Sequence, residues 1–376
     1  RAAAWLHGPP ETADCRVDPN SWGQPDIRRA RGAAGGAAVG CRSVRAVVIQ
    51  PDRSLAVEEV DDPEPGPGQV RIRVEACGIC GSDLHMRPSE GMLPAGSIMG
   101  HEFSGVVDRV GEGVDDWTEG ERVCVFPGRP LDRHDIAAQM EAGVGLGPLP
   151  GAYSEAVVVD ADTLWRLPDD LPLEHGALVE PLAVALHGLD VAGVETGDAV
   201  AVLGAGPIGI MVLAALRARG VERVVAIEPN ERRRELASEL ASHAVGLEGV
   251  HMAVVEALGE PPARVLECAG HPSALPLATE LVASSGVIGL LGVLEEPVEI
   301  SQMNLMIKEA QVRASFAYRP ANFDEAIELI AAGRVPAERL ITAREPLERA
   351  EEMFAELLRP GTDQVKVLLK PGAAGS

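Results

Sequence analysis

Two short segments, close together in the chain, carry side chains that suit a zinc ion. Cys80 opens the run Cys-Gly-Ser-Asp-Leu-His, and His101 and Glu102 follow in the run Gly-His-Glu. Cysteine, histidine and glutamate are preferred zinc ligands, and a catalytic zinc has three protein ligands and one open position. The third ligand is either Glu102 or Glu180, since Glu180 lies in an apolar stretch where a carboxylate is costly unless paired or metal-bound. The pattern predicts a catalytic zinc site and leaves the choice of glutamate open.

Polar side chains beside these ligands are suited to proton transfer. Ser82 is two residues from Cys80, where it could hydrogen-bond a substrate oxygen, and His85 could pass the proton on to solvent. Asp83 could orient His101 through its second ring nitrogen, as carboxylates near metal sites do. The alternative is that Asp83 caps a turn and that His85 is a surface imidazole.

A glycine-rich run further along the chain is typical of dinucleotide binding. It follows an apolar segment and reads Gly204-Ala205-Gly206-Pro207-Ile208-Gly209. The first glycine permits a tight turn, the second lets the backbone approach the pyrophosphate, and the third lets the helix pack close to the sheet. The N-terminus of that helix faces the phosphates. Zinc and a nicotinamide cofactor together predict hydride transfer at an alcohol or carbonyl carbon.

The acid after the next predicted strand favours NAD over NADP. Glu228 stands about 20 residues beyond the glycine-rich run, where the ribose-binding acid is expected. A carboxylate there accepts hydrogen bonds from the ribose hydroxyls and repels a 2′-phosphate. Arg232, Arg233 and Arg234 argue for NADP, because arginines can hold a 2′-phosphate. We interpret these three mainly as the solvated face of the following helix.

The composition indicates two domains with an aliphatic core. The chain has 376 residues, of which 46% are hydrophobic and only 3% aromatic. Its net charge of −24 argues against nucleic acid, because the phosphate backbone attracts lysine and arginine. Scattered cysteines suit a reducing cytoplasm. No apolar stretch has the length to span a bilayer and no secretory leader is evident, so neither a membrane partner nor secretion is expected.

The first 43 residues differ from the rest of the chain. They are rich in arginine, alanine and glycine and show no strand or helix period, whereas a clear strand begins at Val44. We hypothesise that the natural start is Val44, read from a GTG codon, and that the preceding segment is an error of gene prediction. The alternative is a genuine disordered arm. A mass spectrum of the native protein that began well before residue 44 would refute the hypothesis.

Periodicity divides the remaining chain into two kinds of structure. From 44 to about 180 strands and turns predominate, which predicts a small β-barrel; the strands include 69–76, 102–110 and 121–125. Beyond 180 apolar strands alternate with helices, which predicts a parallel sheet with right-handed crossovers. The predicted strands are 200–203, 224–228, 265–268 and 287–293, and the predicted helices are 208–219, 231–240 and 273–283. From about 312 the pattern is mixed, with helices at 323–332 and 347–358 and a strand at 364–369.

The chain resembles the medium-chain, zinc-dependent alcohol dehydrogenases from about residue 44 to 370. The resemblance rests on the motifs at 78–85, 100–102, 180–187 and 204–209. The pair Glu180-Pro181 is similar to the polyol, butanediol and threonine dehydrogenase branch, since the better-known alcohol dehydrogenases usually have cysteine there. By position, Cys80 and His101 match zinc ligands and Glu102 a carboxylate that binds or adjoins zinc. Glu180 matches a variable ligand that can bind through water, and Ser82 and His85 match the proton relay.

The resemblance implies an α/β enzyme of two domains. A GroES-like β-barrel catalytic domain would comprise 44–182 and 312–373, and a Rossmann doubly wound coenzyme domain would comprise 183–311. It also implies that a zinc-activated secondary alcohol or polyol loses its proton through Ser82 and His85 and its hydride to NAD, giving a ketone. Relatives form dimers or tetramers, so a homodimer or homotetramer is expected.

A missing motif suggests a single zinc per chain. Many relatives hold a second, structural zinc with four closely spaced cysteines after the strand that here contains Cys124. Residues 128–149 contain no cysteine. We therefore predict no structural zinc and a short Gly/Pro-rich loop in its place, which argues against glutathione-linked formaldehyde oxidation. A metal analysis that gave two zinc ions per chain would contradict this prediction.

Two other functions are considered. One is a zinc-free quinone or enoyl reductase of the same superfamily, but those enzymes lack the cysteine and the His–Glu pair. The other is a catalytically silent dinucleotide-binding protein, which would have no need of a complete ligand set and relay. Neither explains why Ser82 and His85 stand beside the metal-binding residues.

Overall fold

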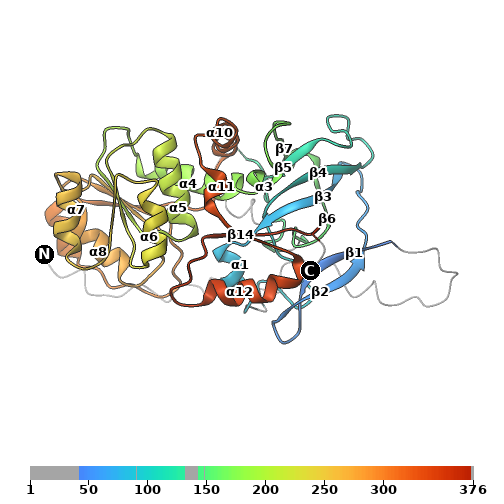
Figure 1. The fold of residues 1–376 in the computed structure, drawn as a ribbon, viewed down its shortest axis with the longest axis horizontal. Helices are drawn as coiled ribbons and strands as arrows, with labels where there is room; N and C mark the ends of the chain where they lie inside the picture. The colour runs from blue at the N-terminus through green and yellow to red at the C-terminus, as the bar shows by residue number, and fades with distance from the viewer. Residues whose placement is uncertain (1–41, 90, 132–142, 148, 374–376) are drawn as a thin grey trace, which may run out of the picture. The chain divides into compact units, whose positions relative to one another are not determined.

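Two sheets organise the part of the chain that the structure describes (Figure 1). The structure is a computed structural model, and it describes residues 42–89, 91–131, 143–147 and 149–373. Residues 1–41 lie outside this description, so the structure does not test the hypothesis that the natural start is Val44. Within these ranges, no helix has both the length and the apolar character needed to cross a membrane.

The second half of the chain forms a six-stranded parallel sheet in the order β10-β9-β8-β11-β12-β13. Counted along the chain this is the order 3-2-1-4-5-6, the arrangement of the Rossmann fold. Its strands are β8 (Val200–Leu203), β9 (Val224–Ile227), β10 (His243–Val245), β11 (Arg264–Glu267), β12 (Val287–Leu290) and β13 (Gln311–Ala314). The helices between them are α5 (Pro207–Ala218), α6 (Glu231–Ser238), α7 (Val250–Leu258), α8 (Ala274–Leu281) and α9 (Gln302–Lys308).

The central strands of this sheet are uniformly apolar because helices cover them. Every residue of β8 and β9 is buried, and strands buried on both faces show continuous rather than alternating hydrophobicity. Figure 1 shows α5, α6, α7 and α8 around this sheet. The sheet therefore presents only its strand ends to a ligand, and the glycine-rich run lies at one such end, directly after β8.

A second, seven-stranded sheet has the order β14-β15-β3-β4-β5-β7, with β6 paired to β3. Its strands are β3 (Gln69–Gly78), β4 (Glu102–Val110), β5 (Arg122–Val125), β6 (Ala156–Asp160), β7 (Leu164–Arg166), β14 (Ile341–Glu345) and β15 (Lys366–Leu369). β15 pairs antiparallel with β3, through Leu368 and Gly78 and through Leu369 and Cys77. Strands that are far apart in the sequence therefore meet at the end of β3.

A small antiparallel sheet and several helices complete the described structure. The small sheet consists of β1 (Ser43–Ile49) and β2 (Leu55–Asp61). The remaining α-helices are α1 (Gly81–Met86), α3 (Leu173–Gly176), α4 (Val179–Ala192), α10 (Pro320–Ala331), α11 (Ala337–Leu340) and α12 (Ala350–Leu358). The short 3₁₀ turns are η2 (Ala161–Thr163) and η3 (Leu347–Arg349).

Helix α4 lies deep in the protein and carries a buried acid into the site. It contacts α5, α10, β12 and β4, and so it has no continuous solvent-facing side and needs no polar stripe. Gly193 ends the helix in the left-handed conformation, at φ 64°. Glu180, in the first turn of α4, is only 8% exposed.

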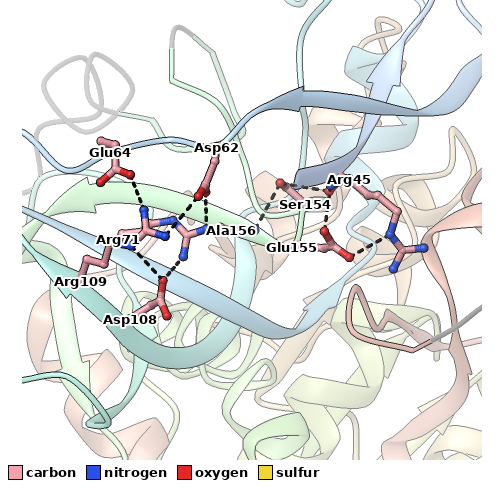
Figure 2. Close-up of polar contacts among 9 residues, drawn as sticks. All are labelled: Arg45, Asp62, Glu64, Arg71, Asp108, Arg109, Ser154, Glu155 and Ala156. Carbon is pink, nitrogen blue, oxygen red and sulfur yellow. Dashed lines mark hydrogen bonds and ion pairs between the residues drawn. The ribbon is translucent and has the colours of Figure 1, made fainter. Parts of the chain in front are cut away.

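Two groups of ion pairs hold the small sheet to its neighbours (Figure 2). Asp62, which follows β2, accepts hydrogen bonds from Arg71 of β3 and Arg109 of β4. Burial alone would raise the pKa of Asp62, but its bonds to the two arginines hold that pKa below the usual carboxyl range. Arg45 of β1 donates to Glu155 through Nε at 2.8 Å. These contacts restrain the small sheet against the strands that lead to the site.

Candidate active site

The predicted metal ligands stand where two neighbouring strands meet. Cys80 follows β3 and is the N-cap residue of α1, and Glu102 begins β4. β3 and β4 are antiparallel, with Gly78 opposite Glu102. The start of β4 therefore lies beside the end of β3, and this brings His101 and Glu102 next to Cys80.

The three side chains form a compact ligand group. The Sγ of Cys80, a ring nitrogen of His101 and a carboxylate oxygen of Glu102 all lie within 4.8 Å of one another. His101 and Glu102 are buried, whereas Cys80 is half-buried and so is accessible from one side. One sulfur, one nitrogen and one oxygen donor fit a zinc ion that keeps a position for substrate. No other such group occurs among residues 42–89, 91–131, 143–147 and 149–373.

His101 is positioned by a buried carboxylate. The Oδ1 of Asp83 lies 3.4 Å from the Nδ1 of His101, and neither atom has a hydrogen-bond partner at normal geometry. Ser82 Oγ lies 3.4 Å from Nε2, on the other side of the ring. Burial lowers the pKa of His101, but the negative charges of Asp83 and Cys80 raise it by more, and the net shift is upward. Charges that favour a proton on the imidazole also favour a bound cation.

Lys366 is a residue of the site that sequence reasoning missed. It is fully buried on β15, and its Nζ binds both carboxylate oxygens of Glu102, at 2.8 and 2.6 Å. Nζ also donates to the main-chain oxygen of Ile79, at 3.3 Å. A carboxylate has about four lone-pair directions, so the contact with Lys366 orients Glu102 and leaves it able to bind a metal. Lys366 is 264 positions from Glu102 in the sequence, so no local motif links the two residues. The pairing of β15 with β3 brings them together in the fold.

Glu180 lies near the ligand group without belonging to it. Burial raises the pKa of Glu180 to about 7, and the charge of Glu102 adds to the rise, while His101 opposes it. Tyr318 gives Glu180 a hydrogen bond. Tyr318 was also missed by the sequence analysis. Its buried ring packs against Phe126 and Phe323, with centroids 5.0 and 5.8 Å away.

The two relay residues share one face of α1. Ser82 and His85 are three positions apart, which places their side chains on the same side of a helix. Ser82 is half-buried beside His101, and His85 is exposed. The arrangement has an inner hydroxyl and an outer imidazole, as transfer of a proton from a buried site to solvent requires.

The glycine-rich run has the geometry of a phosphate-binding turn. Gly204 has φ 90°, and a Cβ on Gly209 would lie 1.9 Å from the Gly204 carbonyl oxygen, so no side chain fits there. Gly206 is the N-cap of α5, and Pro207 and Ile208 begin that helix. The run thus ends in a helix N-terminus with free N–H groups, which favours a phosphate.

Glu228 is buried beside this turn. Its Oε2 accepts a hydrogen bond from the Ala205 amide at 2.7 Å, and its Oε1 accepts one from the Asn230 amide at 2.8 Å. Both bonds fix the carboxylate at the carboxyl end of β9, next to the glycine-rich run. This is the position expected for an acid that contacts the ribose.

The interpretation of the three arginines as a solvated helix face is wrong for two of them. Arg233 donates to the main-chain oxygen of Gln364 at 3.0 Å, and Arg234 donates to that of Glu228 at 2.8 Å. Only Arg232 is solvated, with a side chain 76% exposed. The Nη1 of Arg233 lies 3.8 Å from the place of a Cβ on Gly206. The helical period did not reveal these main-chain contacts, because the accepting residues, Gln364 and Glu228, lie outside α6.

The loop predicted to replace the structural zinc lobe is only partly described. Residues 132–142 and 148 lie outside the described residues. Cys124, on the preceding strand, is buried, and burial raises the pKa of its thiol. The absence of a second zinc remains a prediction.

Comparisons with known proteins agree with this site. The family model "Alcohol dehydrogenase GroES-like domain" matches residues 66–169, and the model "Zinc-binding dehydrogenase" matches residues 207–332. The (R,R)-butanediol dehydrogenase of Bacillus subtilis is 35% identical over 338 residues, which are 85% of this chain and 97% of that protein. The sorbitol dehydrogenase of Gallus gallus is 32% identical over 342 residues, 86% of this chain and 96% of its own.

The fold is shared with solved dehydrogenase structures as well. A zinc-binding dehydrogenase from Sinorhizobium meliloti, solved bound to NADP, superposes with a TM-score of 0.80 at 31% identity and covers 88% of this chain and all of its own. The matched motifs, the Rossmann strand order and the Cys–His–Glu group point to the same family. The chain therefore belongs to the zinc-dependent medium-chain alcohol dehydrogenases, in the butanediol and polyol dehydrogenase branch, and is an oxidoreductase.

Proposed function

We propose that the protein oxidises a secondary alcohol or polyol to a ketone with NAD, using one zinc ion held by Cys80, His101 and Glu102. The observation that carries this proposal is the ligand group itself, whose donor atoms lie within 4.8 Å of one another. The named activities of the similar butanediol and sorbitol dehydrogenases support the substrate class. Of the two glutamates considered, Glu102 is the proposed ligand, and Glu180 is a nearby acid that faces the same group.

The residues around the ligands have distinct roles in the proposed reaction. The Lewis acidity that a bound zinc supplies lowers the pKa of the substrate hydroxyl. Ser82 Oγ would accept the proton of that hydroxyl while giving up its own, and His85 would take that second proton and release it to solvent. Asp83, whose Oδ1 faces the Nδ1 of His101 at 3.4 Å, would favour the proton on Nδ1, and Nε2 would then be the nitrogen that holds the metal. The protein thus contributes orientation and a proton path, whereas hydride transfer belongs to the cofactor.

The position of Glu228 supports NAD as the preferred cofactor. Its carboxylate is held at the end of β9 by two main-chain amides, so it cannot easily move away from a 2′-phosphate. Arg233 lies near Gly206, where the pyrophosphate would approach, and its Nε is buried without a hydrogen-bond partner. We assign Arg233 to the pyrophosphate, which is common to NAD and NADP.

We propose two domains close to the limits expected from the sequence, which were 44–182 and 312–373 for the catalytic zinc domain and 183–311 for the NAD-binding domain. One limit changes: β13 (Gln311–Ala314) pairs with β12 of the parallel sheet, so the NAD-binding domain extends at least to Ala314. The grouping of β14 and β15 with β3 supports the return of the chain to the first domain. The free thiols among the described residues, Cys77, Cys80, Cys124 and Cys268, support a reducing, cytoplasmic location.

A substrate panel tests the proposed function. Reduction of NAD and of NADP is measured with secondary alcohols, vicinal diols, polyols and amino alcohols such as threonine, before and after removal of metal by a strong chelator. We expect turnover with NAD, its loss with the chelator, and its return when zinc is added. Chelator-resistant turnover of quinones or enoyl compounds would indicate the zinc-free reductase. Bound zinc and NAD without any turnover would favour the silent dinucleotide-binding protein.

We also propose a homodimer that forms at the free edge of the parallel sheet. β13 is the edge strand, and the preceding helix α9 exposes large apolar side chains: Met303 by 59%, Met306 by 62% and Ile307 by 74%. An edge strand beside exposed apolar side chains favours pairing with another chain. A second copy related by a two-fold axis would cover this surface on both subunits, and pairing of two dimers would give a tetramer.

Light scattering after size-exclusion chromatography tests the interface. We expect the wild type to have a dimeric or tetrameric mass and Ile307→Glu to have the monomeric mass, because a buried unpaired carboxylate is costly. Met252→Glu is the control, since Met252 is 76% exposed on α7, away from α9 in the sequence. A monomeric wild type, or equal masses for wild type and Ile307→Glu, would contradict the proposal.

A further inference from the structure

We infer that Tyr153 is a positioning residue of the metal site, which acts on His101 through Asp83. The hydroxyl of Tyr153 donates to Asp83 Oδ2 at 2.6 Å, and Asp83 Oδ1 faces His101 Nδ1 at 3.4 Å. The inference rests on the proposed function, since it concerns the same zinc site. It adds a residue that lies 70 positions from Asp83 in the sequence and whose hydroxyl bonds to Asp83 and to the Gly78 carbonyl rather than to a metal ligand.

The two oxygens of Asp83 have separate tasks. Oδ2 accepts hydrogen bonds from the Tyr153 hydroxyl, at 2.6 Å, and from the Cys80 amide, at 3.0 Å. Oδ1 is buried, has no hydrogen bond at normal geometry, and lies 3.4 Å from His101 Nδ1. Asp83 is completely buried, so solvent cannot replace either donor. Without the tyrosine hydroxyl, Oδ2 would keep one donor, and the carboxylate could rotate away from His101.

Tyr153 is itself held in place through its main chain and through its ring. Its amide donates to the Met99 carbonyl at 2.9 Å, and its own carbonyl accepts from the Val47 amide at 2.7 Å. Its ring packs edge-on against Phe354, with centroids 6.2 Å apart. A Cβ on Gly100 would lie 2.6 Å from the ring, so the residue before His101 must be glycine for the ring to fit. The phenol is therefore a rigid support for the carboxylate.

The tyrosine remains a donor throughout the ordinary pH range. Burial raises the pKa of Tyr153 well above its usual value, and the charge of Asp83 raises it further. Since the hydroxyl stays protonated, its short bond to Oδ2 is charge-assisted and stronger than a neutral hydrogen bond. The hydroxyl lies closer to Asp83 Oδ2, at 2.6 Å, than to the Gly78 carbonyl oxygen, at 3.2 Å, because a charged carboxylate is the stronger acceptor.

Tyr153→Phe is the matched change, because it removes the hydroxyl and keeps the ring. Metal-free protein is titrated with Co²⁺, and the dissociation constant and the visible cobalt spectrum are recorded for wild type, Tyr153→Phe, Asp83→Asn and the double variant. We expect Tyr153→Phe to bind Co²⁺ about tenfold more weakly, the lower end of the range for outer partners of metal ligands. In the Asp83→Asn background, the same change should have little further effect, because the two residues act in series.

A structural control separates positioning from loss of stability. Thr279→Val removes another buried hydroxyl, which donates to the Pro276 carbonyl in α8, and should leave cobalt binding unchanged. Equal cobalt affinity in wild type and Tyr153→Phe, or an equal loss from Tyr153→Phe with and without Asp83→Asn, would overturn the inference alone. A wild type that bound no metal would overturn the proposed function as well.

Discussion

Replacing Cys80 with serine is expected to abolish both metal binding and turnover. The thiolate is the ligand form of cysteine, whereas a serine hydroxyl stays protonated and does not replace it. Loss of a direct ligand should weaken zinc binding by more than the roughly 10- to 100-fold typical of losing an outer partner. Zinc content by elemental analysis and NAD reduction with the best alcohol of the panel measure the two effects.

A second buried thiol provides the control for Cys80→Ser. Cys124 is 1% exposed on β5 and is absent from the ligand group. Cys124→Ala should retain one zinc per chain and most of the activity, even if it lowers the free energy of unfolding. Full zinc occupancy and full rate in Cys80→Ser would show that Cys80 is not a ligand.

Replacing Lys366 with methionine is expected to lower the free energy of unfolding of the metal-free protein by about 3–5 kcal/mol. That range applies when one partner of a buried ion pair is removed and the other charge stays buried without compensation. Here the uncompensated charge is Glu102, because both of its oxygens bind Lys366. Denaturant unfolding, with a chelator and with added zinc, measures the effect. Zinc should restore more stability to Lys366→Met than to wild type, since the cation neutralises Glu102.

Two further variants test the explanation of that loss. The double variant Glu102→Gln/Lys366→Met leaves no buried charge and should be more stable than Lys366→Met alone. Lys308→Met is the control for removal of a lysine, because Lys308 donates only to main-chain oxygens of Thr279 and Glu280 in the described structure. If Lys366→Met and wild type unfolded at the same denaturant concentration, the ion pair would not stabilise the site.

Local sequence patterns predicted much of the parallel sheet because its strands are short apolar runs between helices. The strand predicted at 200–203 is present with those limits as β8, and in the seven-stranded sheet the strand predicted at 102–110 is present as β4. The strand predicted at 287–293 ends at Leu290, since Gly292 approaches the loop at Gly270 and leaves the sheet. Helix α4 was not predicted, because a helix buried on nearly all sides lacks the periodic polar residues that identify one.

Local sequence patterns predicted only those residues of the candidate site that are neighbours in the sequence. Cys80, Ser82 and Asp83 are neighbours in the sequence, so their local pattern alone indicated their chemistry. Lys366 and Tyr153 have no such pattern, because the fold brings them to Glu102 and Asp83 from distant parts of the sequence, Lys366 on β15 and Tyr153 in the segment before β6. Single-chain periodicity describes one element at a time, and it contains no information on which distant strand will pair with β3.

The pairing of β15 with β3 has a consequence for the newly made chain on the ribosome. β15 follows every strand of the Rossmann sheet in the order of synthesis, so that sheet can fold first. Until β15 is made, Glu102 lacks the counter-charge of Lys366. We therefore expect a nascent chain to complete its parallel sheet before its metal-ligand group, and zinc to bind late in synthesis.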